Sequence, residues 1–183
     1  AMNAYVSSEK VRDSVRAYKG GIEYPNTRFA ASMQLIAQMI SGKLPTKVYY
    51  AHMPGFDTHA NQRGAHENLM EQLAGGVAAF YKDLDAQGNA DRVVVLAFSE
   101  FGRRVAENGS GGTDHGTAAP MFVFGKALKG GLYGQQPSLT DLSHGDLKHA
   151  IDFRSVYATI LDRWLGADPQ KILGFAFDRI PFI

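Results

Sequence analysis

Five side chains of this chain could hold a divalent metal ion: Asp57, His59, Glu100, Asp114 and His115. Carboxylate oxygen and imidazole nitrogen together suit a borderline ion such as Zn²⁺, whereas Mn²⁺, Ca²⁺ or Mg²⁺ fit better where oxygens dominate. Three ligands of this type leave an open position for a water or a substrate oxygen. Asp-x-His is common by chance, so the prediction depends on whether the fold brings these side chains together.

Two short apolar segments precede the first three of these side chains. Residues 47–53 are rich in β-forming residues, the run 93–98 is nearly unbroken and apolar, and a helix is predicted between them over 65–86. Strand, helix, strand is typical of a βαβ unit, whose crossover is almost always right-handed and whose strands are parallel. The carboxyl ends of parallel strands share one sheet edge. We therefore expect the side chains that follow these strands to converge.

The remaining two candidates, Asp114 and His115, lie in a polar loop before a further apolar run, 121–124. For each residue a structural role remains an alternative. Asp57 could cap the following helix, Glu100 could pair with Arg103 or Arg104, and His115 could be a hydrogen-bonded loop residue.

Helical periodicity predicts the remaining architecture. Helices are expected over 3–18, from about residue 28 to Gly42, over 65–86, and from an N-cap at Asp152 to Gly166, with Asn26 or Thr27 capping the second. Apolar stripes predict the core faces of two of these helices. The stripe residues are Phe29, Met33, Ile36, Ala37 and Ile40 in the second helix, and Leu69, Leu73, Val77, Phe80 and Leu84 in the third.

Composition restricts the function classes. With 183 residues the chain suits a single α/β domain, 1–183, in which 1–26 form a peripheral N-terminal segment. The formal charge of +1 argues against a nucleic-acid partner, and no apolar run is long enough to span a bilayer. Cysteine is absent, which excludes disulfides and thiolate metal sites.

Four motifs resemble a known family. Gly55-Phe56-Asp57-Thr58-His59, Ser99-Glu100-Phe101-Gly102-Arg103, Gly112-Thr113-Asp114-His115-Gly116 and Asp152-Phe153-Arg154 resemble the signatures of the bacterial domain-of-unknown-function family 1501, which is similar to the alkaline phosphatase and sulfatase superfamily. The resemblance implies a three-layer αβα fold with a mainly parallel sheet, of which this chain would be a C-terminal fragment. It also implies an exported or periplasmic protein.

The resemblance assigns roles to the site residues. Asp57 and His59 resemble the pair that binds the first metal, His115 resembles the late histidine that returns to it, and Glu100 stands in the acidic place of the second site. A rival alignment would match Asp114 and His115 to an Asp-His pair. Phe101 stands where a second-site histidine is expected.

These observations predict a metal-dependent hydrolase or transferase of phosphate or sulfate esters. Glu100 would be a second metal ligand or a base, and Arg103 would neutralise an anionic oxygen or pair with Glu100. No residue matches the superfamily's nucleophile, so we expect this chain alone to lack such activity. The alternatives are a non-catalytic exported protein with a structural metal, or an interaction module that uses residues 128–149. An open sheet edge would allow homo-oligomers to form.

Overall fold

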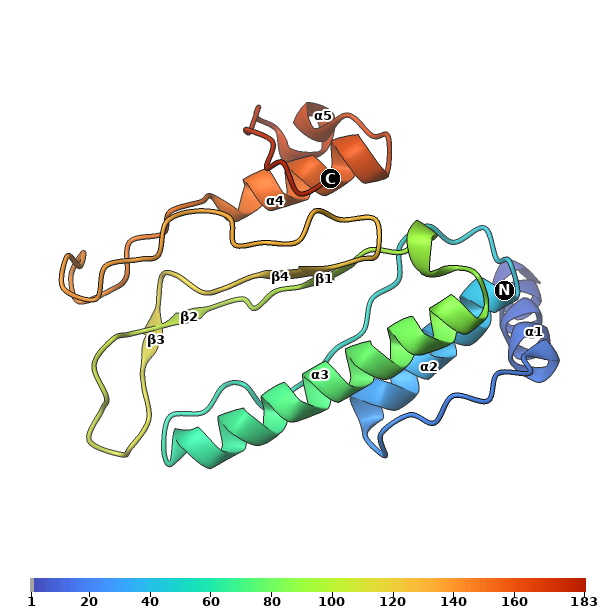
Figure 1. Ribbon diagram of the computed structural model, residues 1–183, viewed down its shortest axis with the longest axis horizontal. Helices are drawn as coiled ribbons and strands as arrows, with labels where there is room; N and C mark the ends of the chain where they lie inside the picture. Colours follow the sequence, from blue (N-terminus) through green and yellow to red (C-terminus); the bar gives the residue numbers. More distant parts are fainter. Residues whose placement is uncertain (1) are drawn as a thin grey trace. The chain divides into compact units, whose positions relative to one another are not determined.

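The computed structural model describes residues 2–183, which divide into two units, one formed by residues up to 58 and 63–93 and the other by 59–62 and 94–183. Figure 1 shows the elements along the chain. The helices are α1 (Met2–Ala17), α2 (Arg28–Ser41), α3 (Gln62–Ala86), the 3-10 turn η1 (Ala90–Arg92), α4 (Phe153–Thr159), the π-helical η2 (Ile160–Trp164) and α5 (Pro169–Leu173), and the strands are β1 (Val95–Ala97), β2 (Gly102–Arg103), β3 (His115–Gly116) and β4 (Phe122–Phe124).

The core of the first unit lies where α2 packs beside α3 (Figure 1). Thr27 caps α2 by accepting a hydrogen bond from the Ala30 amide at 3.1 Å, and Gly42 ends it, as predicted. The buried apolar side chains follow the predicted stripes, and each of the larger ones contributes about 1.5–3 kcal/mol by leaving water. They include Phe29, Met33 and Ala37 from α2 and Val77, Phe80 and Leu84 from α3.

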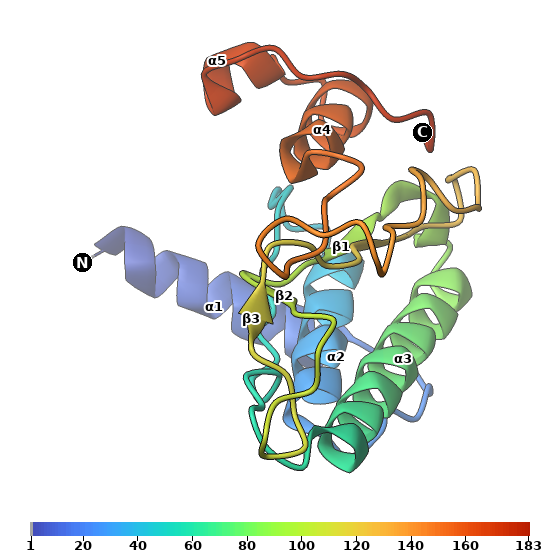
Figure 2. The same cartoon turned by 90° about the vertical axis from the view of Figure 1, so that its left-hand side faces the viewer.

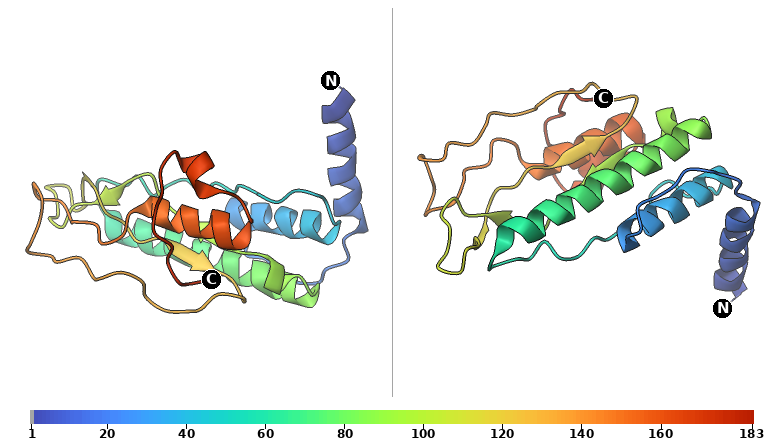
Figure 3. Two further views of the ribbon diagram at one scale, coloured as in Figure 1. Left: turned by 90° about the horizontal axis from the view of Figure 1, so that it is seen from above. Right: turned by 60° about the horizontal axis from the view of Figure 1, so that its bottom comes forward.

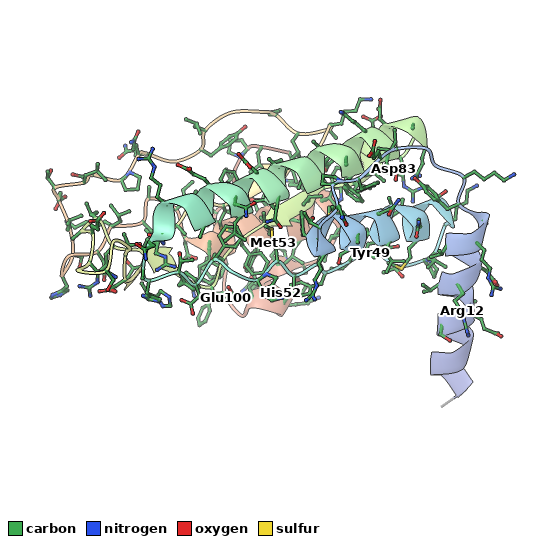
Figure 4. The ribbon with its side chains drawn as sticks, turned by 90° about the horizontal axis from the view of Figure 1, so that it is seen from below. Arg12, Tyr49, His52, Met53, Asp83 and Glu100 are labelled. Carbon is green, nitrogen blue, oxygen red and sulfur yellow. The ribbon has the colours of Figure 1, made fainter. Side chains whose placement is uncertain are left out.

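A buried carboxylate joins the N-terminal part of this unit to α3. Asp83, fully buried, accepts hydrogen bonds from the hydroxyls of Tyr18 at 2.5 Å and Tyr24 at 2.8 Å and from the Gln87 amide at 2.9 Å. Figure 4 shows Asp83 on α3. Burial, reinforced by the hydrogen bond to Asp83, raises the pKa of Tyr18 to about 12, and the same causes raise the pKa of Tyr24. Both tyrosines therefore stay neutral and keep donating.

The second unit contains a long antiparallel hairpin (Figure 1), whose β2 and β3 strands are also labelled in Figure 2. Val95 pairs with Phe124 at the β1–β4 end, and Arg103 pairs with His115 at the β2–β3 end. The return side is one residue longer than the outgoing side (116 to 122 against 97 to 102), so the register shifts by one between the two ladders. The chain thus reverses direction within the 104–114 loop.

The C-terminal helices form the rest of the second unit, and Figure 3 shows α4 and α5 from above. Asp152 caps α4 by accepting from the Arg154 amide at 2.9 Å, as predicted, and the helix continues as η2 to Trp164. The buried Thr159 hydroxyl donates to the Ser155 carbonyl at 2.7 Å and accepts from the Ile180 amide at 2.9 Å. One hydroxyl therefore ties the C-terminal tail to α4.

The prediction of a three-layer αβα fold with a mainly parallel sheet is wrong. In residues 2–183 the strands form two separate two-stranded sheets, both antiparallel. The segment 47–53, predicted as a strand, alternates in exposure, with Val48 and Tyr50 exposed and Tyr49 half-buried, but it pairs with no other strand among the described residues. The apolar run 93–98 contains β1, which pairs instead with β4, the strand on the return side of the hairpin. Within the part described, no helix has the length and apolarity that a bilayer crossing requires.

Candidate metal centre

The loop between β2 and β3 ends with Asp114, and His115 is the first residue of β3. The Arg104 amide donates to the Asp114 carbonyl at 3.0 Å, which continues the ladder by one step beyond the paired strands. Farther along the loop, the backbone amide of Asn108 donates to the Gly112 carbonyl at 2.8 Å. The Asn108 side-chain oxygen accepts from the amides of Ser110 at 3.0 Å and Gly112 at 3.1 Å. The loop is thereby closed around one asparagine.

The segment 59–62 is bound to this loop through its backbone. The Asn61 amide donates to the Ser110 carbonyl and the Gln62 amide to the Gly111 carbonyl, both at 3.0 Å. Gly112 is buried there, and a Cβ on it would lie 2.5 Å from the carbonyl carbon and oxygen of His59. A side chain at this position would therefore collide with backbone. The close approach at Gly112 brings His59 next to the residues of the loop.

Three of the predicted ligands are brought together by this arrangement. The imidazole rings of His59 and His115 lie 4.8 Å apart between centroids. Asp57 precedes His59 by two residues, and one ligand atom from each of Asp57, His59 and His115 lies within 4.8 Å of the others. All three side chains are exposed, so they can be reached by an ion from solution.

Asp114 lies beside the group without belonging to it. Its Oδ1 atom is 3.6 Å from the Nδ1 atom of His59 and accepts a hydrogen bond from the Asn108 side-chain amide at 3.1 Å. That hydrogen bond, together with His59 and the charge of Arg104, lowers the pKa of Asp114. A carboxylate at this place favours the orientation of His59 in which Nδ1 faces Asp114, a common arrangement for metal-binding histidines.

An aromatic ring supports the other imidazole. The Phe101 ring stacks on His115 with centroids 4.0 Å apart and planes inclined by 13°. The Arg103 guanidinium carbon lies 5.0 Å from the centroid of the same Phe101 ring, and its Nη1 atom donates to the Thr113 carbonyl at 2.5 Å. Arg103 and His115 are partners in the β2–β3 ladder, and the guanidinium and the imidazole both contact the Phe101 ring.

The remaining predicted residues take other positions. Glu100 is exposed, lies next to Phe101 in the chain and is outside the three-residue ligand group; Figure 4 labels it. Arg104, one of its suggested partners, lies 3.5 Å from Asp146. Asn108 was not predicted to matter. The Asn108-Gly109 dipeptide is a turn signal, but the contact of the asparagine side chain with the His59 carbonyl joins residues 49 positions apart in the chain.

The fold and the site define a helix-rich chain with an exposed carboxylate and imidazole group beside a long antiparallel hairpin. The chain belongs to the family described as Protein of unknown function (DUF1501), which matches residues 3–180. No curated protein matches the chain, and no solved structure matches it.

Proposed function

We propose that Asp57, His59 and His115 bind one divalent metal ion, and that the site serves a metal-dependent hydrolase or transferase of phosphate or sulfate esters. The observation that carries the proposal is the approach of one carboxylate oxygen and two imidazole nitrogens to within 4.8 Å of one another. Two nitrogens and one oxygen are a donor set that suits Zn²⁺. A bound ion would act as a Lewis acid toward an anionic ester.

Fixed positive charge beside the ligands supports an anionic substrate. Arg103 and His115 are directly paired in the β2–β3 ladder. Arginine binds phosphate and sulfate oxygens through two parallel N–H groups and stays charged at every physiological pH. Arg103 is therefore suited to orient such an ester at His115. We propose Glu100, the neighbour of Phe101 in the chain, as the base.

Metal content after dialysis, with affinity from calorimetry, tests the first half of the proposal. We expect one Zn²⁺ per chain, and we expect His59→Ala or His115→Ala to weaken binding by more than about 100-fold, because losing a ligand costs more than disturbing its partner. His149→Ala is the matched control, since His149 is exposed and outside the ligand group. A wild-type chain that binds no metal would refute the proposal.

Anion binding tests the second half. The metal-loaded chain should bind inorganic phosphate or sulfate, and Arg103→Ala should weaken this binding by about tenfold, the worth of one hydrogen bond to a charged group. We expect no turnover of aryl phosphate or aryl sulfate by the chain alone, because none of its residues matches the superfamily's nucleophile. Measurable turnover would contradict that expectation.

A structural metal is the second candidate function. The segment 59–62 is already held to the 108–112 loop by backbone hydrogen bonds, and an ion between His59 and His115 would reinforce the same attachment. A metal that raises the melting temperature while the loaded chain binds neither phosphate nor sulfate would favour this role over catalysis.

A further inference from the structure

The side chain of Asn108 uses its complete hydrogen-bonding capacity. Its amide nitrogen donates to the His59 carbonyl at 3.0 Å and to Asp114 Oδ1 at 3.1 Å, and its oxygen accepts from the amides of Ser110 and Gly112. A primary amide offers two donor hydrogens and two acceptor positions, and each has a partner here. Turning the amide over would set oxygen against oxygen and nitrogen against N–H, so the arrangement fixes one orientation.

The oxygen and the nitrogen of this side-chain amide bind different parts of the chain. The oxygen half holds the loop to itself, because Ser110 and Gly112 belong to the same turn as Asn108. The nitrogen half reaches outside the turn, to the backbone of His59 and to the carboxylate that faces the His59 ring. Asn108 therefore holds the main chain of His59 directly and its imidazole indirectly, through Asp114.

We propose that Asn108 is a positioning residue for the metal centre, holding His59 where it can share an ion with His115. No other side chain of similar size can replace it: aspartate has no N–H to donate, and serine has a single hydroxyl hydrogen. This inference rests on the proposed metal-binding function and adds to it the residue that sets the position of one ligand.

Asn108→Asp separates positioning from electrostatics. The substitution keeps the size of the side chain and the acceptor oxygen for Ser110 and Gly112, but removes both donors and adds a negative charge. If Asn108 acted only through the local field, the added charge would attract a cation and tighten binding. If it positions His59, binding should weaken by about 10- to 100-fold, as for other residues that orient metal-binding histidines.

Gly109→Asp is the matched control. It adds the same charge one residue away, where a Cβ meets nothing within 4 Å and the backbone φ is not positive, and it leaves the Asn108 amide in place. Calorimetry with Zn²⁺ should give this variant an affinity within about twofold of wild type or tighter. The visible spectrum of bound Co²⁺ should change in Asn108→Asp and stay unchanged in Gly109→Asp, because the spectrum reports ligand geometry. Equal or tighter binding by Asn108→Asp would overturn the inference.

Hydrogen exchange of the metal-free chain gives a readout that needs no ion. The Asn61 and Gln62 amides, which bond to the loop, should exchange faster in Asn108→Asp and in Asn108→Ala than in wild type, while α3 amides beyond them stay unchanged. Unchanged exchange in both variants would refute the proposal that Asn108 holds the 59–62 segment to the loop. A wild-type chain that takes up no metal would instead refute the proposed function, and wild-type affinity retained by Asn108→Asp would refute the role of Asn108 alone.

Discussion

Asp83 and Asp114 are both hydrogen-bonded carboxylates, yet the two units use them in opposite ways. Asp83 is fully buried, and three side chains donate to it. The side chain of Asp114 keeps 61% of its surface exposed and receives one amide hydrogen bond beside an imidazole. The first cluster is complete within the protein, which is typical of a structural network. The second leaves oxygen and nitrogen atoms accessible, which is a requirement for binding something from solution.

Asp83→Ala should produce the largest effect. It would leave the hydroxyls of Tyr18 and Tyr24 without their acceptor, and hydrogen bonds to a charged group contribute about 1.5–3 kcal/mol each. We expect the free energy of unfolding, measured by urea titration, to fall by about 3 kcal/mol or more. Glu71→Ala, an exposed acidic position on the same helix, should change it by less than about 0.5 kcal/mol. Equal losses of unfolding free energy in the two variants would show that the Asp83 cluster does not stabilise the fold.

Gly112→Ala should come next. Its Cβ would lie 2.5 Å from His59 backbone atoms, so either the loop or the 59–62 segment must move. Overpacking of this kind costs about 1–3 kcal/mol, and the displaced His59 should also lower metal affinity. Gly109→Ala, which has open space around its Cβ, is the control for both measurements and should leave them near wild type. Wild-type stability and affinity in Gly112→Ala would show that the close approach is unnecessary.

High pH should destabilise the buried cluster. Because the pKa of Tyr18 is raised to about 12 in the folded chain, its contribution is present below the ordinary tyrosine pKa near 10 and is lost as pH rises toward 12. Urea titrations at pH 8 and pH 11 should therefore give a lower free energy of unfolding at pH 11. The difference should shrink in Tyr18→Phe, and a difference of equal size in that variant would exclude Tyr18 as the cause.

Low pH should affect the exposed cluster, by the smallest amount. The pKa of Asp114 is lowered, first of all by the Asn108 amide, so its contribution is present above the ordinary aspartate pKa and disappears as pH falls through the folded value. Carbon-13 titration of the Asp114 carboxyl by NMR should show a higher pKa in Asn108→Ala than in wild type. The same pKa in both proteins would remove Asn108 as the principal cause.

Sequence reasoning succeeded where the deciding interactions are local. Asp152 was identified as a helix cap, and Thr27 as one of two candidates with Asn26, because a capping side chain bonds to a backbone amide only two or three residues away. The apolar stripe of α3 was also recovered in part, since Val77 and Phe80 are buried as its period requires.

The errors concern contacts between distant segments. The composition of 47–53 suits a strand, but it does not specify a partner. The run 93–98 pairs with a strand that follows it after a loop, not with one that precedes it before a helix. Parallel strands predicted that Asp57 and His59 converge with Glu100, and the family resemblance added His115. The structure groups Asp57 and His59 with His115, beside an antiparallel hairpin and without Glu100. Asn108 escaped prediction because its role depends on the position of His59, which lies far from it in sequence.

The hairpin sets a practical rule for recognising related chains in which the same site can form. Gly102 and Gly116 face each other across the β2–β3 ladder, and a Cβ on either would lie within 2.7 Å of backbone atoms, 2.0 Å from the Ala118 oxygen in the case of Gly102. Gly112 is restricted in the same way by His59. A relative that keeps the aspartate and both histidines but carries a larger residue at any of these glycines must build its hairpin differently. The spacing of the three glycines is therefore a marker of the intact hairpin that the ligands alone do not provide.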